Sequence, residues 1–144
     1  MPFIALNQTL KAHGQSVTAC RQQVFAALSG QEPLSMVELV RRCPDTNRAS
    51  VYRTVALYEK LGIVLRLQTG WKYKLELSDR FHDHHHHATC LECGVSLVIP
   101  EDSALEQQFH ELSNVMGFTM ERHQLEIQGY CSKCQNKRPL KKAR

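Results

Sequence analysis

The stretch IVLRLQTGWKYKLEL, residues 63–77, decides the fold of the first half of this 144-residue chain. Residues 63–67 have high β-propensity, and Trp71 to Leu77 alternates apolar and polar side chains, as a half-buried strand does. The three residues Gln68, Thr69 and Gly70 have the composition of a turn. We therefore expect a β-hairpin over these residues.

Three short amphipathic helices are expected before this hairpin. Thr18 is placed to cap the first, and Ser35 with Glu38 has the spacing of a capping box at the start of the second. The third carries its apolar side chains on one face and ends at Gly62, the position after a helix where glycine is favoured. Three helices and a hairpin predict a winged helix, in which the last helix lies in the major groove of DNA.

Polar side chains gather near the N-terminal end of the third helix, away from its apolar face. They are Arg48, Ser50, Tyr52 and Arg53. By spacing alone, a DNA contact and an ordinary solvated helix face explain them equally well. Charge favours DNA, because residues 1–78 carry ten Lys and Arg against five Asp and Glu, whereas residues 79–136 carry three against nine.

Two CxxC pairs hold four of the six cysteines. Cys90 pairs with Cys93 and Cys131 with Cys134, with 37 residues between the pairs. Thiolates at this spacing take adjacent corners of a tetrahedron, so the two pairs predict a closed structural zinc site with no open position for chemistry. Two disulfides, or four unrelated buried thiols, are the alternative, and nothing in the sequence suggests the oxidising compartment that disulfides need.

The run HDHHHH at residues 82–87 precedes the first CxxC pair. Alternate side chains of an extended strand point to opposite faces, so His84 and His86 are expected on one side and His85 and His87 on the other. One run could thus serve two metal sites, and imidazole suits zinc, iron, nickel and copper. An internal affinity tag is the alternative, but tags normally stand at a terminus.

A helix and a strand are expected after a short strand at residues 94–99. Ser103 is placed to cap the helix, whose inward side chains are Leu105, Phe109, Leu112 and Met116. The strand over residues 118–129 carries His123 on an otherwise apolar face, within reach of Glu106 on the helix. A satisfied core histidine is the alternative, but the neighbouring histidine run favours a metal ligand.

Together these motifs resemble the ferric uptake regulator (Fur) family over nearly the whole chain. The stretches that match are Val17-Thr18 with Arg21, ASVYRTV at 49–55 running to LGIV at 61–64, HHHHxxCxxCG at 84–94 and GYCxxC at 129–134. The resemblance implies an α+β fold with a winged-helix DNA-binding domain and a small α/β dimerisation domain that holds a structural zinc site. The charge distribution places these domains at residues 1–78 and 79–136, and residues 137–144, which add five Lys and Arg, form a basic tail. The resemblance also implies a homodimer that metal closes onto a palindromic operator on double-stranded DNA.

Site residues carry over from the family position by position. The DNA contacts matched are Arg21, Tyr52 and Arg53, and the structural zinc ligands are Cys90, Cys93, Cys131 and Cys134. A further metal site is matched by His84, His86, Glu106 and His123. The sensing site at the hinge is matched in part, by Glu76, His85 and His87, while Pro33 and Val98 stand where other members have a histidine and a carboxylate.

These departures bear on the identity of the regulatory metal. The unbroken histidine run resembles zinc-sensing (Zur-type) members, so Zn²⁺ is favoured for the regulatory site as well as the structural one. Glu76 stands where zinc sensors often have cysteine, and a carboxylate oxygen suits Fe²⁺ or Mn²⁺, the alternative. His82, Asp83 or Glu101 could complete the hinge site.

The prediction is therefore a metal-dependent transcriptional regulator, a repressor by family default, of metal-uptake or homeostasis genes. An enzyme is not expected, because a hydrolytic metal site needs an open coordination position beside a general base and no HExxH-type pairing is present. The alternative from another functional class is a DNA- or protein-interaction module that a structural zinc stabilises and that does not sense metal. No signal peptide and no run of the ~20 apolar residues needed to span a bilayer are found, so a cytoplasmic protein without membrane contact is expected.

Overall fold

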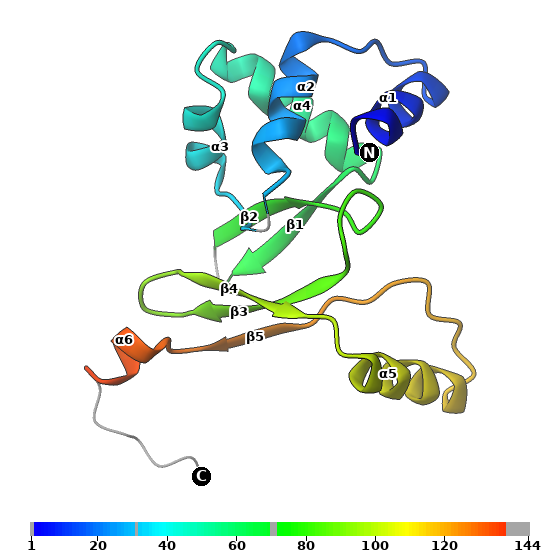
Figure 1. Ribbon diagram of the computed structural model, residues 1–144, viewed down its shortest axis with the longest axis vertical. Coiled ribbons are helices and arrows are strands. Elements are labelled where there is room, and N and C mark those ends of the chain that lie inside the picture. The colour runs from blue at the N-terminus through cyan, green and yellow to red at the C-terminus, as the bar shows by residue number, and fades with distance from the viewer. Residues whose placement is uncertain (1, 31, 70–71, 138–144) are drawn as a thin grey trace. The chain divides into compact units, whose positions relative to one another are not determined.

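The computed structural model describes residues 2–30, 32–69 and 72–137 (Figure 1). The chain divides into two compact units, Met1–Asp83 and His84–Arg144, which are described one at a time. Of the predicted basic tail, residues 138–144 lie outside the described residues. Within the described ranges, no helix combines the length and the apolar character needed to cross a membrane.

Four helices open the first unit: α1 (Pro2–Ala12), α2 (Ala19–Leu28), α3 (Met36–Arg42) and α4 (Arg48–Lys60). The helix α2 begins at its predicted cap, because Thr18 Oγ1 accepts a hydrogen bond from the Arg21 N–H at 3.3 Å. Ser35 and Glu38 make both halves of the capping box at the start of α3. Gly62 follows α4 with a φ of 64°, a left-handed conformation that favours glycine. The helix α1 was not predicted.

Strands β1 (Val64–Thr69) and β2 (Lys72–Leu77) pair antiparallel and form the predicted hairpin (Figure 1). Gln68 and Thr69 were expected in the turn but extend β1, while Gly70 and Trp71 lie outside the described residues. Leu34 adds a short bridge on β2, exchanging two backbone hydrogen bonds with Leu75 at 2.9 and 2.7 Å. The first unit is thus a winged helix.

The core of the first unit lies beneath α4 and holds it in place. Val51, Thr54, Val55 and Tyr58 are buried at helical spacing on one face of α4. The Tyr58 hydroxyl donates to the Arg21 carbonyl at 2.7 Å, which joins α4 to the first turn of α2. The opposite face of α4 is therefore free to carry exposed polar side chains.

The second unit is a three-stranded sheet with two helices. Its elements are β3 (His85–Cys90), β4 (Ser96–Pro100), α5 (Ser103–Val115), β5 (Glu126–Gly129) and α6 (Ser132–Gln135). The strand order is β4-β3-β5, with β4 antiparallel and β5 parallel to β3. His85, His86 and His87 therefore lie on the central strand of the sheet, and Cys90 lies at the end of that strand.

Three expectations about the second unit are wrong. Asp102, and not Ser103, caps α5, since its carboxylate accepts from the N–H groups of Ala104 and Leu105 at 2.9 and 3.0 Å. The strand expected over 118–129 is limited to the four residues of β5, which pair with residues 87–90 of β3. Leu112 and Met116 were expected to turn inward but are exposed, because no described residue of the second unit covers them.

Candidate metal centres and nucleic-acid interface

Four cysteine sulfurs converge at one end of the central strand. Cys90 ends β3, Cys93 lies in the β3–β4 turn, and Cys131 and Cys134 lie at the start of α6 and within it. All four Sγ atoms lie within 4.8 Å of one another, and Cys93 Sγ is 3.7 Å from Cys131 Sγ. A zinc ion with Zn–S bonds of about 2.3 Å needs tetrahedron edges of about 3.8 Å, so the four sulfurs fit that ion.

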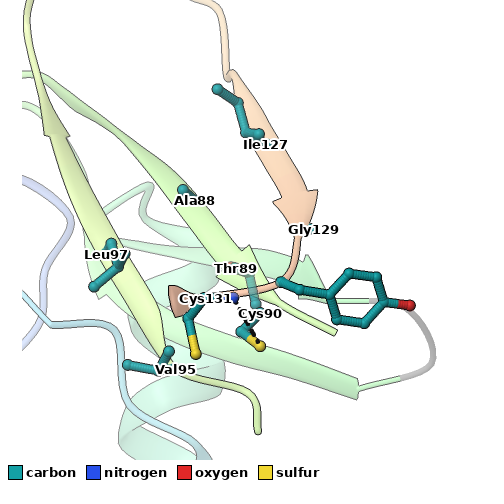
Figure 2. A pocket seen from close by; sticks show the side chains of 9 residues that line it. Ala88, Thr89, Cys90, Val95, Leu97, Ile127, Gly129 and Cys131 are labelled. Carbon is teal, nitrogen blue, oxygen red and sulfur yellow. Dashed lines mark hydrogen bonds between the residues drawn. The ribbon is translucent and has the colours of Figure 1, made fainter. Parts of the chain in front are cut away.

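Backbone N–H groups prepare this cluster for a cation. The Cys131 N–H donates to Cys90 Sγ at 3.4 Å, as Figure 2 shows, and Gly94 adopts a φ of 72° in the turn between Cys93 and β4. Hydrogen bonds from the backbone of Cys93 and of Cys131 lower the pKa of Cys90 to about 6. The pKa of Cys134 is raised instead, first by its hydrogen bond with Cys131 and then by burial. A divalent cation would hold all four as thiolates.

Three histidines and a glutamate form the second cluster. His84 lies immediately before β3, and His86 lies within β3. Glu106 lies in the first turn of α5, and His123 lies in the segment before β5. His86 Nε2 is 2.9 Å from Glu106 Oε1, His123 Nε2 is 3.2 Å from Glu106 Oε2, and His84 Nε2 is 3.3 Å from His123 Nε2. All four ligand atoms lie within 4.8 Å of one another.

The Glu106 carboxylate is the charged centre of this cluster. Burial raises its pKa, but the hydrogen bond to His86 and the charges of His123 and His84 outweigh burial, so the net shift is downward. His86 is only 1% exposed, which leaves its ring shielded from solvent. Three imidazoles and one carboxylate fit a divalent transition metal such as zinc, iron or manganese.

His85 and His87, the two histidines of the run that lie on β3 beside His86, form a separate pair. The rings of His85 and His87 have centroids 4.8 Å apart and are inclined at 79°. Val98 lies directly across the sheet from His87, so β4 offers no oxygen ligand at that position. Glu76, the third residue of this predicted set, belongs to β2 of the first unit.

The predicted DNA-contact residues gather mainly on α4. Asn47 caps this helix by accepting from the Ala49 N–H at 2.8 Å, which starts the helix at Arg48. Arg48, Tyr52 and Arg53 are exposed, and Ser50 Oγ accepts from Arg53 Nη2 at 3.1 Å. Arg21 is instead on α2, where its guanidinium donates to the Ser16 carbonyl and, at 3.1 Å, to Gln15 Oε1.

Sequence reasoning missed one contact that orients the wing. Arg66 of β1 makes two hydrogen bonds to the Glu59 carboxylate of α4, at 2.6 and 2.9 Å. The Arg66 guanidinium also lies 4.1 Å from the centroid of the Tyr73 ring on β2. The sequence does show a glutamate on the expected helix and an arginine on the following strand. No rule of helix or strand geometry, however, predicts that side chains seven positions apart across a turn form an ion pair.

A winged helix joined to a unit rich in clustered metal ligands defines a metal-responsive DNA-binding regulator. Residues 13–128 match the ferric uptake regulator family. The ferric uptake regulation protein of Bordetella parapertussis is 36% identical over 102 residues, which is 69% of this chain and 70% of that protein. The crystal structure of the Vibrio cholerae ferric uptake regulator has a TM-score of 0.71 and 30% identity, covering 87% of this chain and 98% of that one. The chain belongs to the ferric uptake regulator family.

Family membership confirms several predictions made from the sequence. The fold is α+β, with an N-terminal winged-helix DNA-binding domain and a C-terminal dimerisation domain. The protein is a metal-responsive transcriptional regulator that binds DNA and acts as a dimer, and it is not an enzyme. A holo Zur structure, at 19% identity and a TM-score of 0.58 over 92% of this chain and 95% of that one, shares the fold.

Proposed function

We propose that this regulator represses metal-uptake or homeostasis genes and that its regulatory metal is Zn²⁺. The observation that carries the proposal is the presence of two chemically different donor sets in one small unit. The all-thiolate set has no position for exchange chemistry and suits a permanent structural zinc. The set of three histidines and Glu106 offers imidazole and carboxylate ligands instead, which suit a divalent transition metal at a second site, separate from the sensing ligands.

The proposed sensing ligands are Glu76, His85 and His87. A metal held jointly by the two units would favour one arrangement of them, and it shifts the population only by its differential affinity for that arrangement. An oxygen ligand at position 76 supports Fe²⁺ or Mn²⁺ as the second candidate, because both prefer harder donors than thiolate. The unbroken histidine run supports Zn²⁺ as the first.

The proposed DNA partner is a palindromic operator, since a dimer presents two copies of α4 related by symmetry. The proposed contacts are Arg21, Arg48, Ser50, Tyr52 and Arg53. Basic side chains supply a salt-dependent attraction to phosphates, and each good base contact contributes about 1–3 kcal/mol of discrimination. Arg21 fits a phosphate contact better than a base contact, because part of its guanidinium already holds the loop before α2.

The proposed dimer contact is the apolar surface that the second unit leaves exposed. On and after α5 it comprises Leu112, Val115, Met116 and Phe118. On the sheet it comprises an apolar hollow beside Cys90 and Cys131, with Val95, Leu97 and Ile127 on its walls (Figure 2). Covering such surfaces removes apolar area from water, which drives association.

Metal-dependent DNA binding tests the proposed function. Protein purified without added metal would be assayed for metal content, and its binding to its own promoter region followed while Zn²⁺, Fe²⁺ and Mn²⁺ are titrated separately. We expect one tightly held zinc per chain and a switch to DNA binding at low free Zn²⁺. The His85→Ala variant should lose the switch, whereas His110→Ala, an exposed histidine of α5 outside these clusters, should keep it.

Other outcomes identify the alternatives. A switch driven only by Fe²⁺ or Mn²⁺ would overturn the choice of zinc and leave metal sensing in place. DNA binding indifferent to every metal, and to the loss of His85, would instead identify an interaction module stapled by zinc.

A further inference from the structure

On the exposed face of α4, Arg48 contacts the aromatic side chain of Tyr52, and this pair of contacts is called the brace below. Arg48 Nη2 lies 3.4 Å from the Tyr52 hydroxyl oxygen, to which it donates. The carbon at the centre of the Arg48 guanidinium lies 5.5 Å from the centroid of the Tyr52 ring, within the range of a cation–π contact. The same arginine therefore meets both the polar end and the face of one aromatic ring.

We propose that Arg48 is a positioning residue, which holds the Tyr52 side chain in one orientation and thereby sharpens discrimination between the operator and other DNA. The proposal rests on the proposed role of Tyr52 in DNA contact. It replaces the direct DNA contact proposed above for Arg48: this residue orients Tyr52 and does not neutralise a phosphate itself.

Only the side chain of Tyr52 has conformational freedom to lose on binding, because the backbone of α4 is held in place by the core. The neighbouring Val51 and Val55 are buried in the core, so α4 itself is fixed at this point. The Tyr52 side chain is 40% exposed, and an exposed side chain loses rotamer freedom when it binds. A residue four positions earlier on the same helix face can order the ring before DNA arrives.

The brace requires an arginine. Its planar guanidinium can stack on a ring while one N–H group donates, whereas the lysine ammonium is a compact point charge on a flexible stem. Arg48→Lys therefore keeps the positive charge and weakens the brace. Arg41→Lys, at an exposed arginine of α3, is the matched control.

The first test compares specific with non-specific DNA binding. A duplex selected from a random library by the metal-loaded wild-type protein, and a scrambled duplex of equal composition, would each be titrated with full-length protein over a series of salt concentrations. We expect Arg48→Lys to lower the affinity ratio of selected to scrambled duplex roughly two- to fivefold, with the salt slope unchanged. In a Tyr52→Ala background the same change should leave the ratio unaltered, and Arg41→Lys should leave it at the wild-type value.

A phosphate contact gives a different result. If Arg48→Gln weakens binding to both duplexes equally and reduces the magnitude of the salt slope by about 0.9, Arg48 neutralises a phosphate and the proposal is overturned. An unchanged ratio in Arg48→Lys would overturn it as well.

The second test needs no DNA. Scalar couplings of ¹³C-labelled tyrosine should report a single χ1 rotamer for Tyr52 in the wild-type protein, rotamer averaging in Arg48→Lys, and the wild-type result in Arg41→Lys. Averaging in the wild-type protein would overturn this inference whatever the protein binds. The wild-type protein could instead show a single Tyr52 rotamer but bind no duplex with any of the metals. That result would overturn the proposed function and not the ordering of Tyr52 by Arg48.

Discussion

Tyr58 shows at the scale of one residue how the DNA-binding unit is held together. Its ring is fully buried among apolar side chains, and its hydroxyl donates to the Arg21 carbonyl at 2.7 Å. Burial raises the pKa of Tyr58 well above its usual value, so the hydroxyl stays protonated and remains a donor. One hydrogen bond therefore connects α4, the proposed DNA-contact helix, to α2.

Tyr58→Phe removes this hydroxyl and leaves the ring in place. We expect a loss of about 1 kcal/mol in the free energy of unfolding, because the Arg21 carbonyl loses its partner inside the fold. Urea denaturation followed by circular dichroism measures it. Tyr52→Phe, at an exposed tyrosine of the same helix, should change stability by less than about half as much. Equal effects of the two changes would contradict the structural role given to Tyr58.

At the scale of one element, α3 depends on its cap because it has only seven residues. The Ser35 N–H donates to Glu38 Oε2 at 2.7 Å, and Ser35 Oγ accepts from the Glu38 N–H at 3.3 Å. The hydrogen bonds from the Ser35 side chain and then from its backbone lower the pKa of the Glu38 carboxyl below its ordinary value of 4.5. A carboxylate with a lowered pKa in the folded state stabilises the fold above that ordinary value and loses this contribution as the pH falls through the lowered pKa.

The cap can be tested by its pH dependence. Ser35→Ala should cost about 1 kcal/mol of unfolding free energy at neutral pH. Glu38→Gln should be less stable than the wild-type protein at neutral pH, and the difference should shrink as the pH falls below the ordinary pKa of the carboxyl. Thermal unfolding over a pH series measures both, with Glu32→Gln, an exposed glutamate of the same unit, as the control. A difference that persists in acid would show that Glu38 acts by packing rather than by charge.

At the scale of the whole molecule, the proposed dimer contact would cover apolar surface that the described residues of the second unit leave exposed. Val115 at the end of α5 is 86% exposed, and no residue of α5 is buried within the chain. A helix with an apolar stripe and no cover is unfavourable in water unless a partner covers it.

Val115→Asp places a charge in the proposed dimer contact. We expect the dissociation constant of the dimer to rise roughly tenfold or more, because the partner would have to desolvate a carboxylate. Sedimentation velocity over a concentration series measures the shift toward monomer. Val37→Asp, at a valine of α3 that is 56% exposed in the first unit, should leave the dimer intact. A Val115→Asp protein that remains dimeric at low concentration would place the contact elsewhere.

Features that depend on neighbouring residues could be predicted from the amino-acid sequence. Thr18, the Ser35–Glu38 box and Gly62 were predicted correctly, since caps are contacts within one helical turn. The alternation in residues 71–77 predicted the wing for the same reason, because strand periodicity is local. The helix α1 also had a local signal that was missed, because Phe3, Leu6 and Leu10 have helical spacing and pack on the core through contacts such as that of Phe3 with Phe25.

Only the tertiary structure decided features that join distant residues or depend on what covers a surface. Residues 118–125, before β5, form no strand, because pairing with β3 ends at Glu126, and Leu112 and Val115 of α5 stay exposed in the described part of the second unit. The four ligand atoms of His84, His86, Glu106 and His123 come within 4.8 Å of one another although the first and the last residue are 39 positions apart in the chain. The sequence gives the chemistry of each ligand, but their distances follow from the packing of a strand, a helix and a loop, which no local pattern specifies.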